Sequence, residues 1–562
     1  TYKPSNERTT TAPVTHDQRL YSFEVPQGVS IYGGFKGDED YSSGGVNSIP
    51  AEGGEKVVSN MGDITTILSK RDYSDFNQNG INEPWELANQ TILSGQINAS
   101  STAQNAYHVV FTDKGTATTV NPVVLDGLTV MNGETDNQLS KLSISTDENE
   151  QGRGGGIYSN GVTYTISRCR LLNNTAVRGG AVFVRDADLN LSGCILAGNK
   201  TVENKATDNT LASRGGAAYV SGISKAVNLR AVNTLWANNE SAGEGGAIGT
   251  NYAEGVSSSH DPLLYIMNNT FVRNKAITNP VIYTHNGKSS IVNTLLWGNL
   301  GDTYQNPTNL STIYDVSYCA SDVDYVNKFA SGNANHNILL SIDNMGDNGP
   351  RFTNPSTVAG VAGNSASSLW NPAAISVLTD AGDGTEHNGD QSNSSETDHT
   401  PNGTTGAYQE WFSGNGYLGQ NGVTEAYITG GTYSRYSGPR GDYNEELCKP
   451  IDIGLYEYQY ISNFSTMPAI YVATLSAGNG SGNSWANATD DLRGAIVGAA
   501  NPTDNVEKPR IVYVRDGNYS WNRTSAGSAY ILNMNNDDKN KSLTLKGSCT
   551  GSGELQDFSK PT

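Results

Sequence analysis

The sequence predicts an all-β chain whose main part is a right-handed parallel β-helix with inserted loops. Two short signatures alternate between residues 153 and 299, and the segments that join them are short and rich in β-branched and aromatic residues. No segment there carries a sustained helical period of apolar residues, so strands are the better interpretation. Repeats of this size are typical of a solenoid, a propeller or an array.

The first signature is a charged residue followed by two glycines and a small residue. It begins at Arg153, Arg178, Arg214 and Glu244. Glycine permits a positive φ where the chain turns sharply, and it lets neighbouring backbones approach closely. We therefore expect the four copies to stack at one corner of successive coils.

The second signature is a large apolar residue three positions before an asparagine. The asparagines are Asn174, Asn199, Asn239, Asn274 and Asn299, with uneven spacings (199 − 174 = 25, 239 − 199 = 40, 274 − 239 = 35, 299 − 274 = 25). A side-chain amide can hydrogen-bond the same amide in the coils above and below, so we expect a vertical asparagine column. Loops of different length that leave at one corner explain the spacings, with roughly 20–30 residues per coil.

Two of these repeats resemble a known family. Gly245-Gly-Ala-Ile248 and Phe271-Val-Arg-Asn274 look like the paired GGA[ILV] and FxxN repeats of polymorphic outer-membrane proteins, which are bacterial surface adhesins with passenger β-helices. The chain is also similar to large β-helical surface proteins of Bacteroides-type bacteria. That resemblance rests on blocks at 29–35, 91–95, 107–110, 125–129, 293–299 and 452–457, in that order. It implies the fold and a cell-surface location, and it says little about a ligand.

The composition narrows the classes of partner. Of the 562 residues, 36 are Lys or Arg and 56 are Asp or Glu, which gives a net charge of −20. Nucleic acid and anionic lipid are poor partners for such a chain, because both require clustered basic residues. An acidic surface is compatible with calcium and with remaining soluble outside a cell. The resemblance implies an extracellular location at the bacterial cell surface, either outer-membrane-attached or secreted. No run of 18 apolar residues occurs, so we expect no transmembrane segment.

Five cysteines are too few and too scattered for a disulfide framework. Cys169 and Cys194 are 25 residues apart (194 − 169), and each stands five positions before a column asparagine. We expect them to stack in adjacent coils, either as two buried thiols that act as small apolar residues or as a disulfide.

A calcium-loop pattern, D-x-[DN]-x-[DN]-G-x5-E, occurs at residues 75–86. In that pattern the ligands would be the side chains of Asp75, Asn77, Asn79 and Glu86 and the carbonyl of Ile81. Only two of these ligands carry charge, and Pro84 stands where an exiting helix would form. The segment is therefore not an EF-hand domain, and a plain Asn/Gly-rich surface turn is the alternative to a Ca²⁺ site.

The arginines Arg153, Arg178 and Arg214 are candidate ligand-binding residues. Stacked coils are about 4.8 Å apart, so like charges in one column repel unless they are neutralised. Nearby carboxylates or turn carbonyls could do this, and so could the uronate or sulfate groups of a bound polysaccharide. Asp126, which precedes Gly127, is interpreted as a turn former rather than as a catalytic group.

We expect three parts in the chain: a β-helix at 1–461, a linker at 462–468, and the N-terminal part of a second β-helix module at 469–562. Aligning Tyr519 with Tyr2 brings Leu543 near Val29, which suggests tandem modules of a longer protein. The second module should begin with a strand and a short capping helix at 490–500. A long polar insertion at 384–446 is expected either to stack sugars or to fold back as a lid.

The most favoured function is a non-catalytic bacterial cell-surface protein, an adhesin or a glycan-binding stalk. Its expected partners are a polysaccharide or a host or bacterial surface glycoprotein, together with neighbouring modules. The alternative is a polysaccharide lyase or glycoside hydrolase that acts on acidic glycans. Such enzymes need a carboxylate pair, or a base with cationic neutralisers, and no compact acidic pair recurs at the repeat spacing.

Overall fold

The computed structural model describes most of the region up to residue 372 and a smaller part of the rest. The described residues are 1–4, 18–36, 68, 71–74, 86–97, 105–135, 152–203, 213–252, 262–284, 288–301, 313–323, 337–346, 348–372, 378, 454, 469–473, 484–485, 488, 492, 495, 510–515 and 543–549.

Three long parallel sheets make up the main body, and each is named here by its strands. Sheet 1 contains β1 (Phe23–Glu24), β4 (Val110–Asp113), β7 (Ile157–Asn160), β11 (Val182–Arg185), β15 (Ala218–Gly222), β18 (Ile248–Tyr252) and β22 (Ile282–Tyr283). Sheet 2 contains β2 (Ser30–Tyr32), β5 (Val123–Asp126), β8 (Tyr164–Ser167), β12 (Leu189–Ser192), β16 (Asn228–Val232), β19 (Leu263–Met267), β23 (Lys288–Val292) and β26 (Ile313–Ser317). Sheet 3 contains β3 (Thr91–Ser94), β6 (Leu128–Met131), β9 (Arg170–Leu172), β13 (Ile195–Ala197), β17 (Leu235–Ala237), β20 (Thr270–Val272), β24 (Leu295–Trp297), β27 (Ala320–Ser321) and β28 (Ile338–Leu339).

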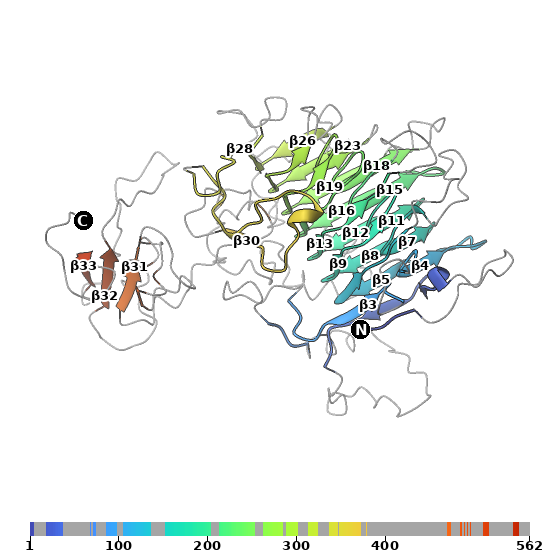
Figure 1. Cartoon of the computed structure of the whole chain (residues 1–562), viewed down its shortest axis with the longest axis horizontal. Coiled ribbons are helices and arrows are strands. Elements are labelled where there is room, and N and C mark those ends of the chain that lie inside the picture. The colour runs from blue at the N-terminus through green and yellow to red at the C-terminus, as the bar shows by residue number, and fades with distance from the viewer. Residues whose placement is uncertain are drawn as a thin grey trace, which may run out of the picture.

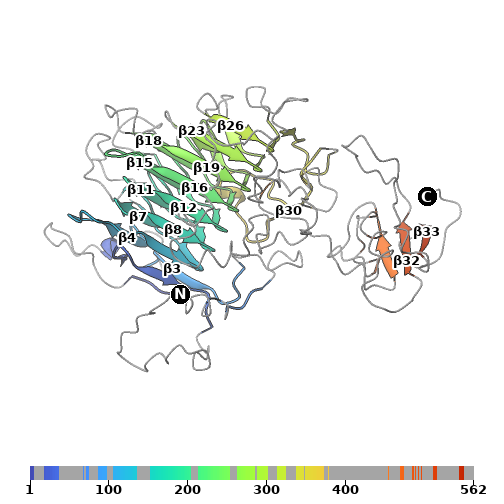
Figure 2. The same cartoon turned by 180° about the vertical axis from the view of Figure 1, so that it is seen from behind.

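From β1 to β24 the chain visits the three sheets in turn, so each circuit there adds one strand to every sheet. From β7 to β9, and again from β11 to β13, consecutive strands lie in sheets 1, 2 and 3 (Figure 1). Seen from behind, the strands of sheet 1 rise in order from β4 to β18 (Figure 2). The predicted all-β architecture of stacked parallel strands is confirmed, and the arrangement is consistent with a parallel β-helix.

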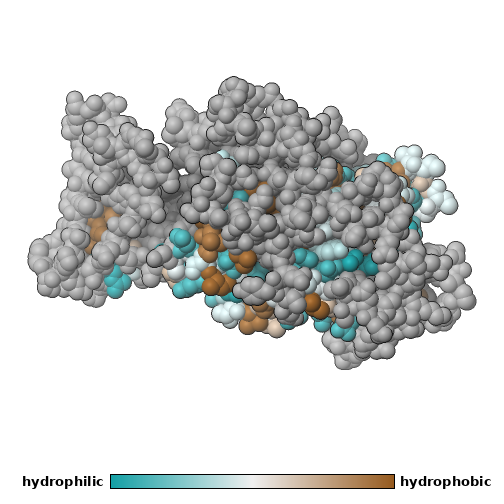
Figure 3. Space-filling view, turned by 90° about the horizontal axis from the view of Figure 1, so that it is seen from above, coloured by the Kyte–Doolittle hydropathy of each residue, from teal (hydrophilic) through white to brown (hydrophobic). Residues whose placement is uncertain are grey.

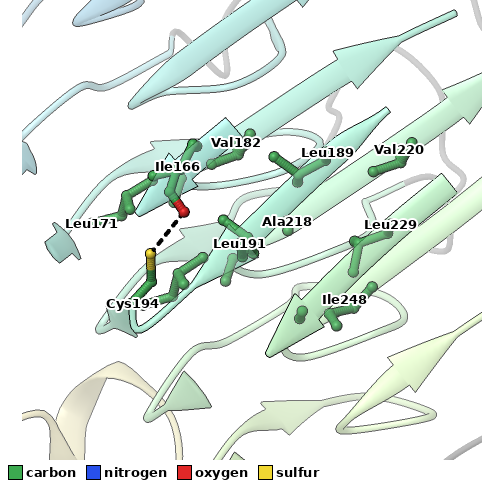
Figure 4. Packing of buried hydrophobic residues seen from close by; sticks show 14 of the residues in the cluster. Ile166, Leu171, Val182, Leu189, Leu191, Cys194, Ala218, Val220, Leu229 and Ile248 are labelled. Carbon is green, nitrogen blue, oxygen red and sulfur yellow. Dashed lines mark hydrogen bonds between the residues drawn. The ribbon is translucent and has the colours of Figure 1, made fainter. Parts of the chain in front are cut away.

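The core runs along the interior between the sheets. Val182 pairs with Ala218, which pairs with Ile248, so aliphatic side chains form continuous inward columns. Figure 4 shows them packed together with Leu189 and Leu229 of sheet 2. Full burial of such a side chain contributes about 1.5–3 kcal/mol, and stacking repeats it in every coil.

The predicted asparagine column is present. The Nδ2 groups of Asn174, Asn199, Asn239 and Asn274 each donate to the Oδ1 of the next asparagine, at 3.0–3.1 Å. Each Nδ2 also donates to a backbone carbonyl in the preceding coil, as Asn239 does to Leu196. The residue before each asparagine of the column has a positive φ, for example Asn238 with φ 54°.

The cysteines of the core are free thiols. Cys169, Cys194 and Cys319 are buried and unbridged, which confirms the thiol interpretation for the first two. Cys194 Sγ donates to the carbonyl oxygen of Ile166 at 3.3 Å, the contact drawn in Figure 4. Burial raises the pKa of Cys194 to about 12, so this thiol stays protonated and unreactive.

A segment from 348 to 372, here called the strap, crosses the outer face of sheet 3. It contains β29 (Phe352–Asn354), which pairs antiparallel with β30 (Leu369–Pro372), and the 3-10 helix η9 (Val361–Gly363) (Figure 1). Its Phe352 and Trp370 pack with outward apolar residues of sheet 3 such as Trp297.

Short strands complete the corners of the coils. The parallel pairs are β10 (Thr175–Ala176) with β14 (Lys200–Thr201), and β21 (Lys275–Ala276) with β25 (Leu300–Gly301). The 3-10 helix η1 (Gln18–Leu20) precedes β1. Among the described residues, Figure 3 shows apolar and polar side chains mixed rather than one continuous apolar face.

The C-terminal part forms a separate parallel sheet of β31 (Ala469–Val472), β32 (Arg510–Arg515) and β33 (Leu543–Cys549). Leu492 and Ala495, from the expected capping helix, are helical and pack with this sheet. The expected linker and the polar insertion lie outside the described residues. The domain limits at 461 and 469 therefore stay predictions.

Candidate binding surface: an arginine and aromatic column on sheet 1

The charged-Gly-Gly turns stack at one corner, as expected. Arg153 pairs with Arg178, Arg178 with Arg214, and Arg214 with Glu244, all in parallel register. The glycine after each has a positive φ, and at Gly179 (φ 61°) a Cβ atom would lie 2.1 Å from the carbonyl oxygen of Val182. Only glycine fits there, so the turn brings the charged side chains into one column.

A second column, of aromatic rings, lies beside the first. Phe111, Tyr158, Phe183 and Tyr219 are in register on the outward side of sheet 1. Their ring centroids are 5.3–5.6 Å apart and their planes lie within 7° of parallel. Although they point outward, the last three are buried, so something other than the core covers them.

Arginines provide that cover for Phe183 and Tyr219. The Cζ atoms of Arg153 and Arg178 lie over the rings of Phe183 and Tyr219, at 5.2 and 5.6 Å from the ring centroids. Each arginine thus covers the ring of the next coil, and Arg153 is only 6% exposed. A cation over a ring face contributes about 0.5–2 kcal/mol, more where water is excluded.

The aromatic column is interrupted at Gly249, which is in register with Tyr219 in the next coil. A Cβ atom at Gly249 would lie 3.1 Å from the Cβ of Arg214 and 3.0 Å from the ring of Tyr219. Arg214 Cζ lies 4.5 Å from the ring centroid of Tyr283, the closest of the three pairs. The Arg214 side chain therefore occupies the region where the missing ring would stand.

Glu244 neutralises the upper end of the arginine column. Its Oε2 accepts from Arg214 Nε at 2.8 Å, and its Oε1 from Thr278 Oγ1 at 3.5 Å. Burial alone would lower the pKa of Arg214, but Tyr219, Tyr283 and Glu244 together raise it. For Arg214, the Glu244 carboxylate therefore offsets the repulsion between the stacked arginines. The structure brings the three predicted arginines together, and their role as ligand-binding residues stays a prediction.

The aromatic column was not predicted, although the sequence carries a signal for it. An aromatic residue stands five positions after each arginine: Tyr158 after Arg153, Phe183 after Arg178, and Tyr219 after Arg214. The fourth copy, which begins with Glu244, has Gly249 at that position. Arginine and ring therefore recur at a constant offset, and each of Arg153 and Arg178 covers the ring of the next repeat.

The calcium motif lies almost wholly outside the described residues, which exclude Asp75, Asn77, Asn79 and Ile81. Its last member, Glu86, is buried, and its carbonyl oxygen accepts from Ser74 N at 2.8 Å. The backbone of Ala88 donates to Asp72 at 2.9 Å. Ser74, the residue before the motif, is thus held beside Glu86, its last residue. In the described part of the chain, no group of three His, Cys, Asp or Glu side chains could hold a metal ion.

Asp126 has a different role from the expected one. Its side chain is fully buried, accepts from Arg71 Nη1 at 2.5 Å and from Arg168 Nε at 2.9 Å, and also pairs with Arg168 Nη2. Burial opposes ionisation, but the two guanidinium groups more than offset it and hold the pKa of Asp126 below its ordinary value. Asp126 is thus the centre of a buried ion cluster that joins two coils to the segment before β3.

Comparisons with known proteins add no relative. The chain matches no family model, no curated protein and no solved structure. Within the described residues, no helix is both long and apolar enough to cross a membrane.

Proposed function

We propose that the chain is a right-handed parallel β-helix of a bacterial cell-surface protein, a non-catalytic adhesin or glycan-binding stalk. The observation that carries the proposal is the regular column of guanidinium groups and rings on the outer face of sheet 1. A solenoid offers one face repeated at the coil spacing, which suits a polymeric ligand. The resemblance of the repeats to those of surface adhesins supports an extracellular location.

The ion pairs around the arginines favour binding over catalysis. Asp126 is engaged by Arg71 and Arg168, and Glu244 by Arg214. A general acid must carry a proton at the working pH, but two guanidinium groups hold the pKa of Asp126 below its ordinary value, and the Glu244 carboxylate is occupied by its bond from Arg214. These two acids are therefore better suited to holding coils together than to cleaving a sugar chain.

Incubation with a panel of neutral and acidic polysaccharides, with calcium present, tests the proposal. Pull-down with each immobilised polymer measures binding, and mass analysis of the sugars detects cleavage. We expect retention on one class of polymer with the sugars intact. Shortened or unsaturated products would contradict the proposal and favour the polysaccharide lyase or glycoside hydrolase alternative.

We also propose that residues 75–86 bind Ca²⁺. The support is the sequence pattern together with the pairing of Ser74 with Glu86, because the first and last ligands of such a loop must lie close together. Calcium should raise the melting temperature relative to EDTA, and Glu86→Gln should abolish the rise while Glu134→Gln keeps it. Equal melting temperatures with calcium and with EDTA would contradict this site.

A further inference from the structure

One hydroxyl group of the aromatic column has no hydrogen-bond partner among the described residues. Tyr219 is fully buried, and in the part of the chain that the structure describes its Oη makes no hydrogen bond. Burying a hydroxyl without a partner is unfavourable, because the group gives up its bonds to water. Another buried tyrosine is satisfied: Tyr164 Oη lies 2.5 Å from Thr112 Oγ1. The Tyr219 hydroxyl is thus a buried donor for which these residues supply no acceptor.

Two guanidinium groups lie beside this residue. Arg178 lies over the Tyr219 ring, and Arg214, in the same coil as Tyr219, is also near that ring, since a Cβ atom at Gly249 would lie 3.0 Å from the ring and 3.1 Å from the Cβ of Arg214. The nearby carboxylate, Glu244, accepts from Arg214 and Thr278. Gly249 is in register with Tyr219 in the next coil, and it places no side chain between Tyr219 and Arg214. A negatively charged acceptor is the chemical complement of this arrangement.

We propose that the Tyr219 hydroxyl and the guanidinium groups of Arg178 and Arg214 bind one oxyanion, a carboxylate or a sulfate. The N–H groups of a guanidinium lie in its plane, so an arginine whose face covers a ring can still donate sideways to an oxyanion. The phenol adds a neutral donor that fixes the position of the anion.

The source of the oxyanion distinguishes two cases. One is the uronate or sulfate group of an acidic polysaccharide, and this case rests on the proposed function. The other is a free inorganic oxyanion that neutralises the column. Successive coils are about 4.8 Å apart, comparable with the length of one sugar unit in an extended chain, so the first case fits the repeat.

Sulfate is the first probe, titrated at constant ionic strength against chloride and followed by calorimetry. We expect saturable binding to the wild-type chain and about tenfold weaker binding to Tyr219→Phe. Tyr158→Phe, which changes another ring of the same column, should bind like the wild type. Without sulfate, Tyr219→Phe should melt at or above the wild-type temperature, because it keeps the ring and removes an unpartnered hydroxyl. Equal sulfate affinities for Tyr219→Phe and the wild type, or no saturable binding to the wild type, would overturn the site.

Polygalacturonate, chondroitin sulfate and neutral dextran separate the two sources. Binding of an acidic polymer that is weakened by Tyr219→Phe and displaced by sulfate supports the glycan source. Sulfate binding without polymer binding leaves the oxyanion site in place and contradicts the proposed function. Polymer binding that Tyr219→Phe does not change supports the proposed function and overturns this site.

Discussion

The outer faces of sheets 1 and 3 are covered in two different ways. On sheet 1, the rings of Phe183 and Tyr219 are covered by arginines of the preceding coils. On sheet 3, outward apolar residues such as Trp297 are covered by the strap, whose Phe352 packs at 5.5 Å from the Trp297 ring. The first cover is built into each repeat, and the second comes from a single later segment of the chain.

This difference bears on function. A face covered by its own repeat stays periodic, and it presents the same groups once per coil. A face covered by a strap loses its period and is closed to a polymeric ligand while the strap is in place. Arg273 holds the strap through its Nε, which donates to Ser356 O at 2.9 Å, and its own carbonyl, which accepts from Gly360 N at 2.7 Å. Sheet 1 is therefore the better candidate for the binding face.

The largest effect is expected from breaking the cover of sheet 3. Trp297→Ala should lower the free energy of unfolding by about 3–5 kcal/mol, since Trp297 is buried against the strap. Trp297→Phe should cost less, because it keeps most of the packing and loses mainly the hydrogen bond from Nε1 to Ser341 O. Urea denaturation measures both. A loss below about 1 kcal/mol for Trp297→Ala would mean that the strap does not rest on this residue.

The asparagine column should be nearly as sensitive, because its amides are buried. Asn239→Ala removes the Nδ2 donor to Asn274 Oδ1 and Leu196 O, and it removes the Oδ1 that accepts from the backbone N and the Nδ2 of Asn199. We expect a loss of about 2–4 kcal/mol in urea denaturation. Asn364→Ala is the matched control, since its bond to Asn173 is exposed, and it should cost less than about 1 kcal/mol.

The turns beneath the arginine column give the next effect. Gly179→Ala should cost about 2–3 kcal/mol, because it adds a clash with Val182 O to the strain of a positive φ. Gly115→Ala measures the strain of a positive φ without a clash, since Gly115 has φ 54° and open space around it. This variant should cost only about 1 kcal/mol. Equal losses in thermal unfolding would contradict the close packing of the turns.

The smallest expected effect is a pH dependence of stability, and it comes from Asp322, which is near Arg273. Burial raises the pKa of Asp322 to about 6. Its Oδ2 accepts from Gly298 N at 3.0 Å, and within the described residues its Oδ1 has no partner. Its folded pKa lies above the unfolded value, so the folded state gains stability as the pH falls through 6, by about 1 kcal/mol between pH 7 and pH 5.

Asp322→Asn should remove this dependence between pH 7 and 5, as measured by urea denaturation at several pH values. Asp343→Asn, at an exposed turn, serves as the control and should leave it unchanged. If the stability of Asp322→Asn depended on pH as the wild type does, the pKa of Asp322 would not be raised by folding.

The sequence predicted those features that repeat at short range. The glycine turns and the asparagine column follow from signatures that recur in each coil, and the backbone register then places them. The contacts of the strap could not be predicted, because Asn238 and Val358 are 120 residues apart and no repeat relates them. The same holds for Asp126, whose partner Arg71 is 55 residues away. The aromatic column was predictable in principle from its constant offset of five residues.

Hydrogen exchange with mass spectrometry, with and without a bound acidic polysaccharide, tests the central claim most directly. If the outer face of sheet 1 is the binding face, amides of residues 153–185 and 213–222 should gain protection, and those of the strap should not change. Protection confined to the strap or to sheet 3, or the appearance of cleaved sugars during the exchange, would contradict the account.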